Sequence, residues 1–204
     1  VCFSCELIQD PQVKQERTQF AQTGEQGKLL VLHSLSRDLA ILAGAKLELG
    51  LSIDNSHLPC LAPNTIKEYQ NQLFIVCSLS QQIMIWDRFT LQSLSTIHLD
   101  NNVNPWDIAF YQDRLFVSSF LKNGILVFKK VSGQYQYQSF IDLSPLAKPS
   151  SLARPQSLLV LGDKLWVSLA HLDPMYRGVE LGRVAHIDLH DSYSIDYMEM
   201  NYAN

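Results

Sequence analysis

Short apolar runs separated by polar turns follow one another along most of the chain. The clearest example lies between residues 106 and 143, where four runs (WDIAFY, RLFVSSF, GILVFKK and YQYQSFIDL) are separated by QD, LKN and VSGQ. Runs rich in Val, Ile, Phe, Leu and Tyr and bounded by Asp, Asn, Gly and Ser are typical of β-strands joined by tight turns. No segment sustains the apolar stripe of a helix. The pattern therefore predicts an all-β protein of short antiparallel strands.

The four-run unit recurs along the chain. QLFIVCSLSQQIMIWD, residues 72–87, aligns with RLFVSSFLKNGILVFK, residues 114–129, at an offset of 42 residues. A third copy, KLWVSLAHLD, begins at Lys164 with an offset of 50, and a weaker early copy, LLVLHSLSRDLAIL, begins at Leu29 with an offset of 44. A fixed period of this length indicates a repeat architecture.

Three prolines mark the same point of three copies. Pro63, Pro105 and Pro155 lie 42 and 50 residues apart, and each is followed by an apolar run. Proline has no N–H to donate and a fixed φ, so it suits the first residue of a strand rather than its middle. We therefore expect a strand to begin at each of these prolines.

Four antiparallel strands every ~42 residues describe one blade of a β-propeller. We divide the chain into an N-terminal tail, 1–11, and a propeller region, 12–204, whose blades span approximately 12–60, 61–102, 103–152 and 153–200. A β-sandwich is the competing architecture, but it does not require self-similarity at a fixed period.

Four blades leave the closure of the ring open. Blades normally cover each other's apolar faces around the ring, and an open array would expose two such faces. We expect, in this order, a part of a larger ring, a homodimer, or a compact four-blade ring.

The composition of the chain limits the kinds of partner that are expected. The chain has 16 Lys plus Arg against 20 Asp plus Glu, a net charge of −4, and no basic run. Nucleic acid is therefore not an expected partner. The longest apolar stretch, LAILAGA at 39–45, is far below the ~18 residues of a membrane span, so no transmembrane segment is expected.

The four cysteines give weaker signals. Cys2 and Cys5 have C-x-x-C spacing, but zinc would need a second ligand pair and thiol exchange a βαβ context. FSC, ending at Cys5, is a poor match to a lipoprotein processing site, which would make Cys5 a lipid anchor. Cys77 lies in an apolar run and is most simply a buried apolar residue. The disulfide state of Cys2, Cys5, Cys60 and Cys77 stays open.

Residues 104–189 resemble the YncE-like and NHL-like β-propellers of the bacterial cell envelope. The resemblance rests on NPWDIAF, RLFVSSFLKNGILVF, FIDLSPLA and GDKLWVSLAHLD followed by GRVAHID. It implies a scaffold and an exported location, periplasmic or at the cell surface, and no particular activity.

In a propeller, the loops that enter the first strand of each blade and those that join the second and third strands lie on one face, around the central channel. We call this the channel face. The longest departure from the repeat is the insertion 171–182, and such insertions usually map to a binding face. This face also carries the turn Lys122–Asn123. The candidate ligand-binding residues on it are Asn104, Trp106, Asp107, Arg154, Gln156, His171, Asp173, Tyr176, Arg177 and Glu180.

No catalytic or metal-binding residues are predicted. HIDLH places His186 and Asp188 on one strand face, but the repeat register puts His190 beyond the strand, so the three side chains need not converge. No nucleophile elbow, phosphate loop or dinucleotide fingerprint occurs. No cofactor is expected.

Three functions stay open. The first is a non-enzymatic exported propeller that binds a protein or a small ligand through its channel-face loops. The second is a calcium-dependent hydrolase of the lactonase or gluconolactonase kind, which would need several carboxylates or Asn from different blades. Asn104 and Asp107 could supply calcium ligands. The residues at the position of Asn104 in the neighbouring blades, however, are Arg154 and Ala62, which could not. The third is an incomplete product without autonomous function, since the chain begins with Val1.

Overall fold

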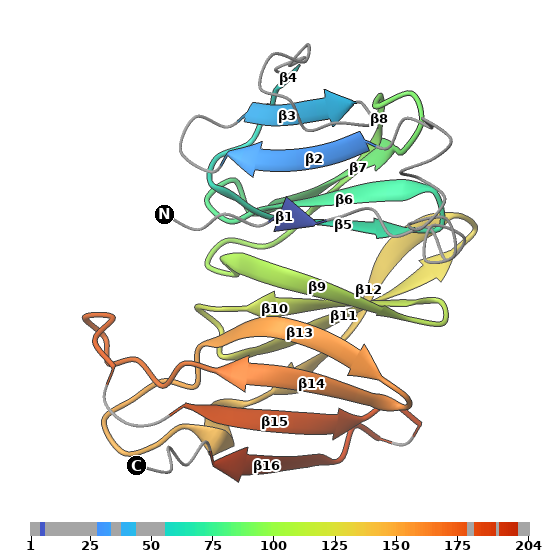
Figure 1. Cartoon of the computed structure of the whole chain (residues 1–204). Coiled ribbons are helices and arrows are strands. Elements are labelled where there is room, and N and C mark those ends of the chain that lie inside the picture. The colour runs from blue at the N-terminus through green and yellow to red at the C-terminus, as the bar shows by residue number, and fades with distance from the viewer. Residues whose placement is uncertain are drawn as a thin grey trace, which may run out of the picture. The chain divides into compact units, whose positions relative to one another are not determined.

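In the computed structural model, the described part of the chain comprises residues 5–6, 28–33, 38–43, 56–178, 182–190 and 192–199, with side chains described from Leu58 onward. This part contains four antiparallel sheets of four strands, each with its strands in chain order (Figure 1). One 3-10 turn, η1 (Ser144–Leu146), is the helical element of the described residues, and no helix there could cross a membrane.

The sheets are numbered along the chain. The first contains β1 (Cys5–Glu6), β2 (Lys28–His33), β3 (Asp38–Ala43) and β4 (Ser56–His57). The second contains β5 (Pro63–Tyr69), β6 (Gln72–Cys77), β7 (Gln82–Asp87) and β8 (Ser93–His98). The third contains β9 (Pro105–Tyr111), β10 (Arg114–Ser119), β11 (Gly124–Val131) and β12 (Gln134–Asp142). The fourth contains β13 (Pro155–Leu161), β14 (Lys164–Leu169), β15 (Arg183–Asp188) and β16 (Ile195–Glu199).

These sheets have the antiparallel order of four strands predicted for propeller blades, although β1 and β4 of the first sheet have only two residues each. Pro63, Pro105 and Pro155 are the first residues of β5, β9 and β13. The first sheet also includes Cys5–Glu6, which pairs with β2 although it lies in the segment set apart as a tail. The chain forms two compact units: residues 1–80 with 84–96, and residues 81–83 with 97–204.

The repeat extends to the backbone of the strand entries. Ala62, Asn104 and Arg154, which precede the three prolines, all have left-handed φ values, of 50°, 45° and 51°. Few residues other than glycine adopt this conformation. The carbonyl of each accepts a hydrogen bond from the residue just beyond the second strand of its own sheet, Ser78, Phe120 and Ala170 respectively, at 3.0 to 3.2 Å. Each loop that enters a first strand is therefore fastened to the end of the second strand.

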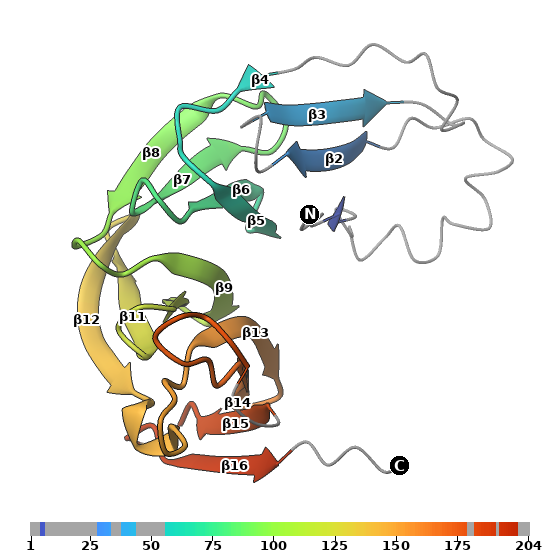
Figure 2. The same cartoon turned by 90° about the vertical axis from the view of Figure 1, so that its left-hand side faces the viewer.

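The second unit has a core between the third and fourth sheets, whose first strands β9 and β13 lie side by side (Figure 2). The third sheet contributes one buried apolar face and the fourth sheet another. The main core residues are Ala109, Phe116, Ile125, Val127 and Ile141 from the third sheet and Leu158, Leu165, Val167, Ala185 and Ile187 from the fourth.

Polar bonds also link these two sheets. The Asp107 carboxylate accepts hydrogen bonds from the N–H of Ile108 and, across to β13, from the N–H of Leu158, both at 2.8 Å. Ser118 donates its hydroxyl to the carbonyl of Gln156 at 2.8 Å. These contacts hold β9 and β10 of the third sheet against β13 of the fourth.

The first unit has its own core around β6, formed by Leu58, Cys60, Ile66, Leu73, Ile75, Cys77, Met84 and Trp86. Cys77 is buried, as the sequence predicted, and it forms a disulfide with Cys60, with the two Cα atoms 5.7 Å apart. The bond joins the loop before β5 to the end of β6.

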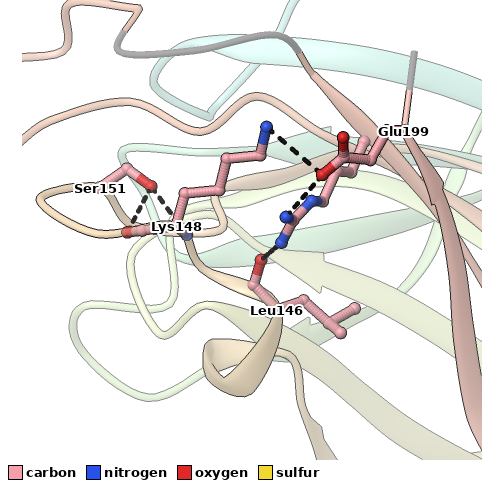
Figure 3. Close-up of polar contacts among 5 residues, drawn as sticks. Leu146, Lys148, Ser151 and Glu199 are labelled. Atoms are coloured by element: carbon pink, nitrogen blue, oxygen red, sulfur yellow. Dashed lines mark hydrogen bonds and ion pairs between the residues drawn. The ribbon is translucent and has the colours of Figure 1, made fainter. Parts of the chain in front are cut away.

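An ion-pair network ties the loop after η1 to the last strand of the fourth sheet. The Glu199 carboxylate accepts a 2.8 Å hydrogen bond from the guanidinium of Arg183 and lies 3.7 Å from Nζ of Lys148. Figure 3 shows Lys148 and Glu199 facing each other, with Ser151 bonded to the Lys148 backbone. Arg183 also donates to the carbonyl of Leu146 at 2.8 Å.

The network predicts a pH effect on stability. The Arg183 hydrogen bond, followed by the charge of Lys148, holds the pKa of Glu199 below its ordinary value of 4.5. Because ionised Glu199 is favoured by the folded state, its contribution is present above about pH 4.5 and is lost as the pH falls through the lowered pKa. We expect the free energy of unfolding of Glu199→Gln, measured with urea, to fall less than that of the wild type as the pH is lowered from about 5 to 3. Identical pH profiles would contradict this role.

Candidate functional site

Aromatic side chains gather where β9 and β13 begin, in the second unit. The indole of Trp106, in β9, stacks on the ring of Phe120 with centroids 5.2 Å apart. On the loop between β14 and β15, Tyr176 lies parallel to the Phe120 ring within 9°, with centroids 6.1 Å apart. In Figure 1 this loop projects at the end of the sheet where β13 begins. Three chain segments thus bring aromatic rings together.

Arg154 occupies the centre of this group. Its guanidinium carbon lies 4.8 Å from the Phe120 ring centroid and 5.0 Å from that of Tyr176. Both distances are in the range of cation–π contacts. Nη1 donates to the carbonyl of Phe120 at 3.2 Å. We call Trp106, Phe120, Arg154 and Tyr176 the Arg154 cluster.

The backbone of Arg154 is positioned by the third sheet. Its N–H donates to Oδ1 of Asn123, in the turn between β10 and β11, at 3.1 Å. One repeat earlier, the N–H of Asn104 donates in the same way to Oε1 of Gln81 at 2.8 Å. Asn123 and Gln81 are 42 residues apart, which is the offset between the two copies of the repeat that contain them. The turn of one blade therefore holds the strand entry of the next.

The loop that carries Tyr176 is held by one carboxylate. Asp173 accepts hydrogen bonds from the N–H groups of Met175 and Arg177, at 2.8 and 2.9 Å, and from Nε of Arg177 at 2.7 Å. The backbone bond to Arg177 is the largest of the effects that hold the pKa of Asp173 below its ordinary value. Asp173 and Arg177 therefore serve to shape the turn that presents Tyr176.

The structure brings some of the predicted site residues together and separates others. Asn104, Trp106, Arg154 and Tyr176 lie at or beside the cluster, and His171 is fully buried at the start of the loop. The Asp107 side chain is turned into the interface between β9 and β13. The Gln156 carbonyl accepts a hydrogen bond from Ser118 of β10. Glu180 lies outside the described residues.

Phe120 is the member of the cluster that the sequence did not single out. It ends the run RLFVSSF, which predicts the second strand of the blade, whereas β10 ends at Ser119. Phe120 is 4% exposed and contacts Trp106, Arg154 and Tyr176. The only available signal was an aromatic residue directly before a polar turn, which is a weak one.

The residues at this end do not form a carboxylate site for a metal ion. Across the described ranges, no three His, Cys, Asp or Glu side chains are grouped so that they could hold one. In HIDLH, His186 lies against the Trp166 ring, at 5.1 Å, and 3.6 Å from Asp196. His190 lies beyond β15, as predicted, and 3.0 Å from Asp163.

Comparison with known proteins gives a likeness in fold alone. No family model matches the chain, and no curated protein matches it in sequence. Among solved structures it is similar to virginiamycin B lyase from Staphylococcus aureus, with a TM-score of 0.59 and 14% identity over 87% of this chain and 53% of that one. It is also similar to a protein from Lactobacillus plantarum, with a TM-score of 0.64 and 11% identity over 85% of this chain and 54% of that one.

A third similar structure is the dihydro-heme d1 dehydrogenase NirN, with a TM-score of 0.56 and 13% identity over 85% of this chain and 35% of that one. The chain thus spans about half the length of the first two structures and less of the third. At these identities the likeness concerns architecture and not activity. Together with the four-stranded antiparallel sheets, it establishes that the chain has the β-propeller fold, built of four-stranded blades.

Proposed function

We propose that this protein is an exported, non-enzymatic β-propeller that binds a ligand through the Arg154 cluster. The observation that carries the proposal is the convergence of three aromatic rings and a buried cation from separate segments. Aromatic walls with a few polar groups are the usual composition of a small-molecule site. Tyr176 is 58% exposed, so one wall of the cluster is open to solvent.

The alternatives receive less support. A calcium-dependent hydrolase would need several carboxylate or Asn side chains from different strand entries, where this chain has Asn104 but also Ala62 and Arg154. Asp107, the nearest carboxylate in sequence to these entries, accepts backbone hydrogen bonds instead. Binding without chemistry therefore fits the described side chains better.

The disulfide supports the exported location. Disulfides persist in oxidising compartments and are rare in the cytosol. The Cys60–Cys77 bond is buried in the core of the first unit, where it acts as a structural link. A lipid anchor at Cys5 belongs to the same proposal, although its side chain lies outside the described part of the chain.

The binding role can be tested with planar aromatic probes. We would measure saturation-transfer NMR signals of phenol, benzamide and benzoate with the wild type, with Tyr176→Ala and with Tyr137→Ala. Tyr137, on β12, is 59% exposed and therefore a matched control for Tyr176. We expect at least one probe to bind, the signal to fall severalfold in Tyr176→Ala, and Tyr137→Ala to resemble the wild type. The proposal is wrong if no probe binds, or if Tyr176→Ala binds as the wild type does.

A further inference from the structure

We infer that the Arg154 cluster is selective for a planar organic monoanion, a carboxylate carried on an aromatic or similarly flat body. The inference rests on the binding role proposed above and adds the chemical class of the ligand. It starts from Arg154, which is 4% exposed although arginine is almost never buried without a partner.

The guanidinium of Arg154 is incompletely satisfied. Nη1 donates to the carbonyl of Phe120, and Nε is buried and has no hydrogen-bond partner among the described residues. No described carboxylate forms an ion pair with Arg154, whereas Arg177 and Arg183 each have one. An edge of the guanidinium that includes Nε therefore has no acceptor within the described part of the chain.

An unpaired buried cation does not stabilise a fold. Removing a charge from water has a large free-energy cost, which is offset only when a counter-charge and hydrogen bonds replace the water. An apolar residue of similar size would pack against the rings without that cost. The edge formed by Nε and one Nη matches the two oxygens of a carboxylate, which binds it through two parallel hydrogen bonds.

A second polar atom at the same end also lacks a partner. Oδ1 of Asn104 is buried and accepts no hydrogen bond from any described residue. Asn104 and Arg154 occupy equivalent repeat positions before β9 and β13, and the backbone of Phe120 bonds both of them. Two polar atoms on adjacent strand entries, both without a hydrogen-bond partner among the residues described, indicate that a polar ligand group belongs at this end.

The remaining features set the shape and charge of the ligand. The exposed Tyr176 ring lies nearly parallel to the buried Phe120 ring, so a flat body that stacks on Tyr176 would extend this arrangement. Arg154 is the one cation in contact with these rings in the described part of the chain. A single positive charge balances a monoanion rather than the two charges of a phosphate monoester.

The test compares benzoate, its neutral isostere benzamide, and phenyl phosphate, by isothermal titration at low salt. We expect benzoate to bind at least about tenfold more tightly than benzamide, since a charge-assisted bidentate bond exceeds a neutral one by more than ~1.4 kcal/mol. Arg154→Met should remove this preference. Its melting temperature should equal or exceed that of the wild type, because it removes a buried unpaired charge at similar volume.

The outcomes separate the two proposals. If benzamide binds as tightly as benzoate, the monoanion inference is wrong while the binding role stands. If phenyl phosphate binds more tightly than benzoate, a dianion is the ligand and the inference is again wrong. If no probe binds, both proposals fail. Arg154→Lys, which keeps the charge but loses the planar fork, should bind benzoate severalfold more weakly than the wild type, and equal binding would contradict the bidentate geometry.

Discussion

Replacing both Cys60 and Cys77 by alanine is expected to lower the free energy of unfolding of the oxidised protein by about 3 kcal/mol. The two cysteines are 17 residues apart, and a cross-link of that span restricts the unfolded chain by roughly this amount. Both lie in the buried core around β6, so the lost sulfur contacts add to the effect. Denaturant unfolding of the variant and the wild type measures the difference.

Reduction provides the control for the disulfide. The wild type in excess reductant should unfold at a lower denaturant concentration than the oxidised wild type, and at a slightly higher one than the double variant, which also lacks the sulfur contacts. The variant should be insensitive to reductant. The assignment fails if the double variant is as stable as the oxidised wild type, or if peptide mapping finds Cys60 and Cys77 as free thiols.

Gly124→Ala is expected to destabilise the second unit by roughly 2 to 3 kcal/mol. A Cβ atom at Gly124, the first residue of β11, would approach Cε2 of Phe140 to 2.8 Å and would lie closer still to the carbonyl oxygen of Ile141. Phe140 could rotate, but the carbonyl belongs to β12, which pairs with β11 along its whole length. The strands would have to separate locally, so thermal or denaturant unfolding should report a large loss.

Gly178→Ala is the matched control for Gly124→Ala. An added Cβ at Gly178 would meet no atom within 4 Å. The free energy of unfolding of Gly178→Ala should therefore stay within about 0.5 kcal/mol of the wild-type value. A Gly124→Ala variant as stable as Gly178→Ala would contradict the close approach of β12 to Gly124.

The strand pattern could be predicted from the sequence because it depends on local chemistry. Proline fixes the beginnings of β5, β9 and β13, and polar turns end the apolar runs. The offset of 42 residues also relates contacts that no single run reveals, since Asn104 and Arg154 are held by equivalent bonds from Gln81 and Asn123. The repeat in sequence is thus also a repeat in the hydrogen bonds that side chains of one blade accept from the strand entry of the next.

The site could be predicted only in outline. The repeat pointed to Asn104, Trp106 and Arg154 as strand-entry residues and to the loop of Tyr176, but the choice among them depends on side-chain contacts between sheets. Asp107 shares its strand with Trp106, yet its side chain points to Leu158 and not to the cluster. The Cys60–Cys77 bond was equally hidden, because four cysteines allow several pairings and their spacing does not select one.

A crystal structure of the chain soaked with benzoate would test the central claim, binding at the Arg154 cluster, most directly. We predict the carboxylate within about 2.7–2.9 Å of Nε and one Nη of Arg154, with the benzoate ring stacked against Tyr176. A structure in which a carboxylate of the chain itself pairs with Arg154, or in which benzoate binds elsewhere and leaves Arg154 unchanged, would contradict it.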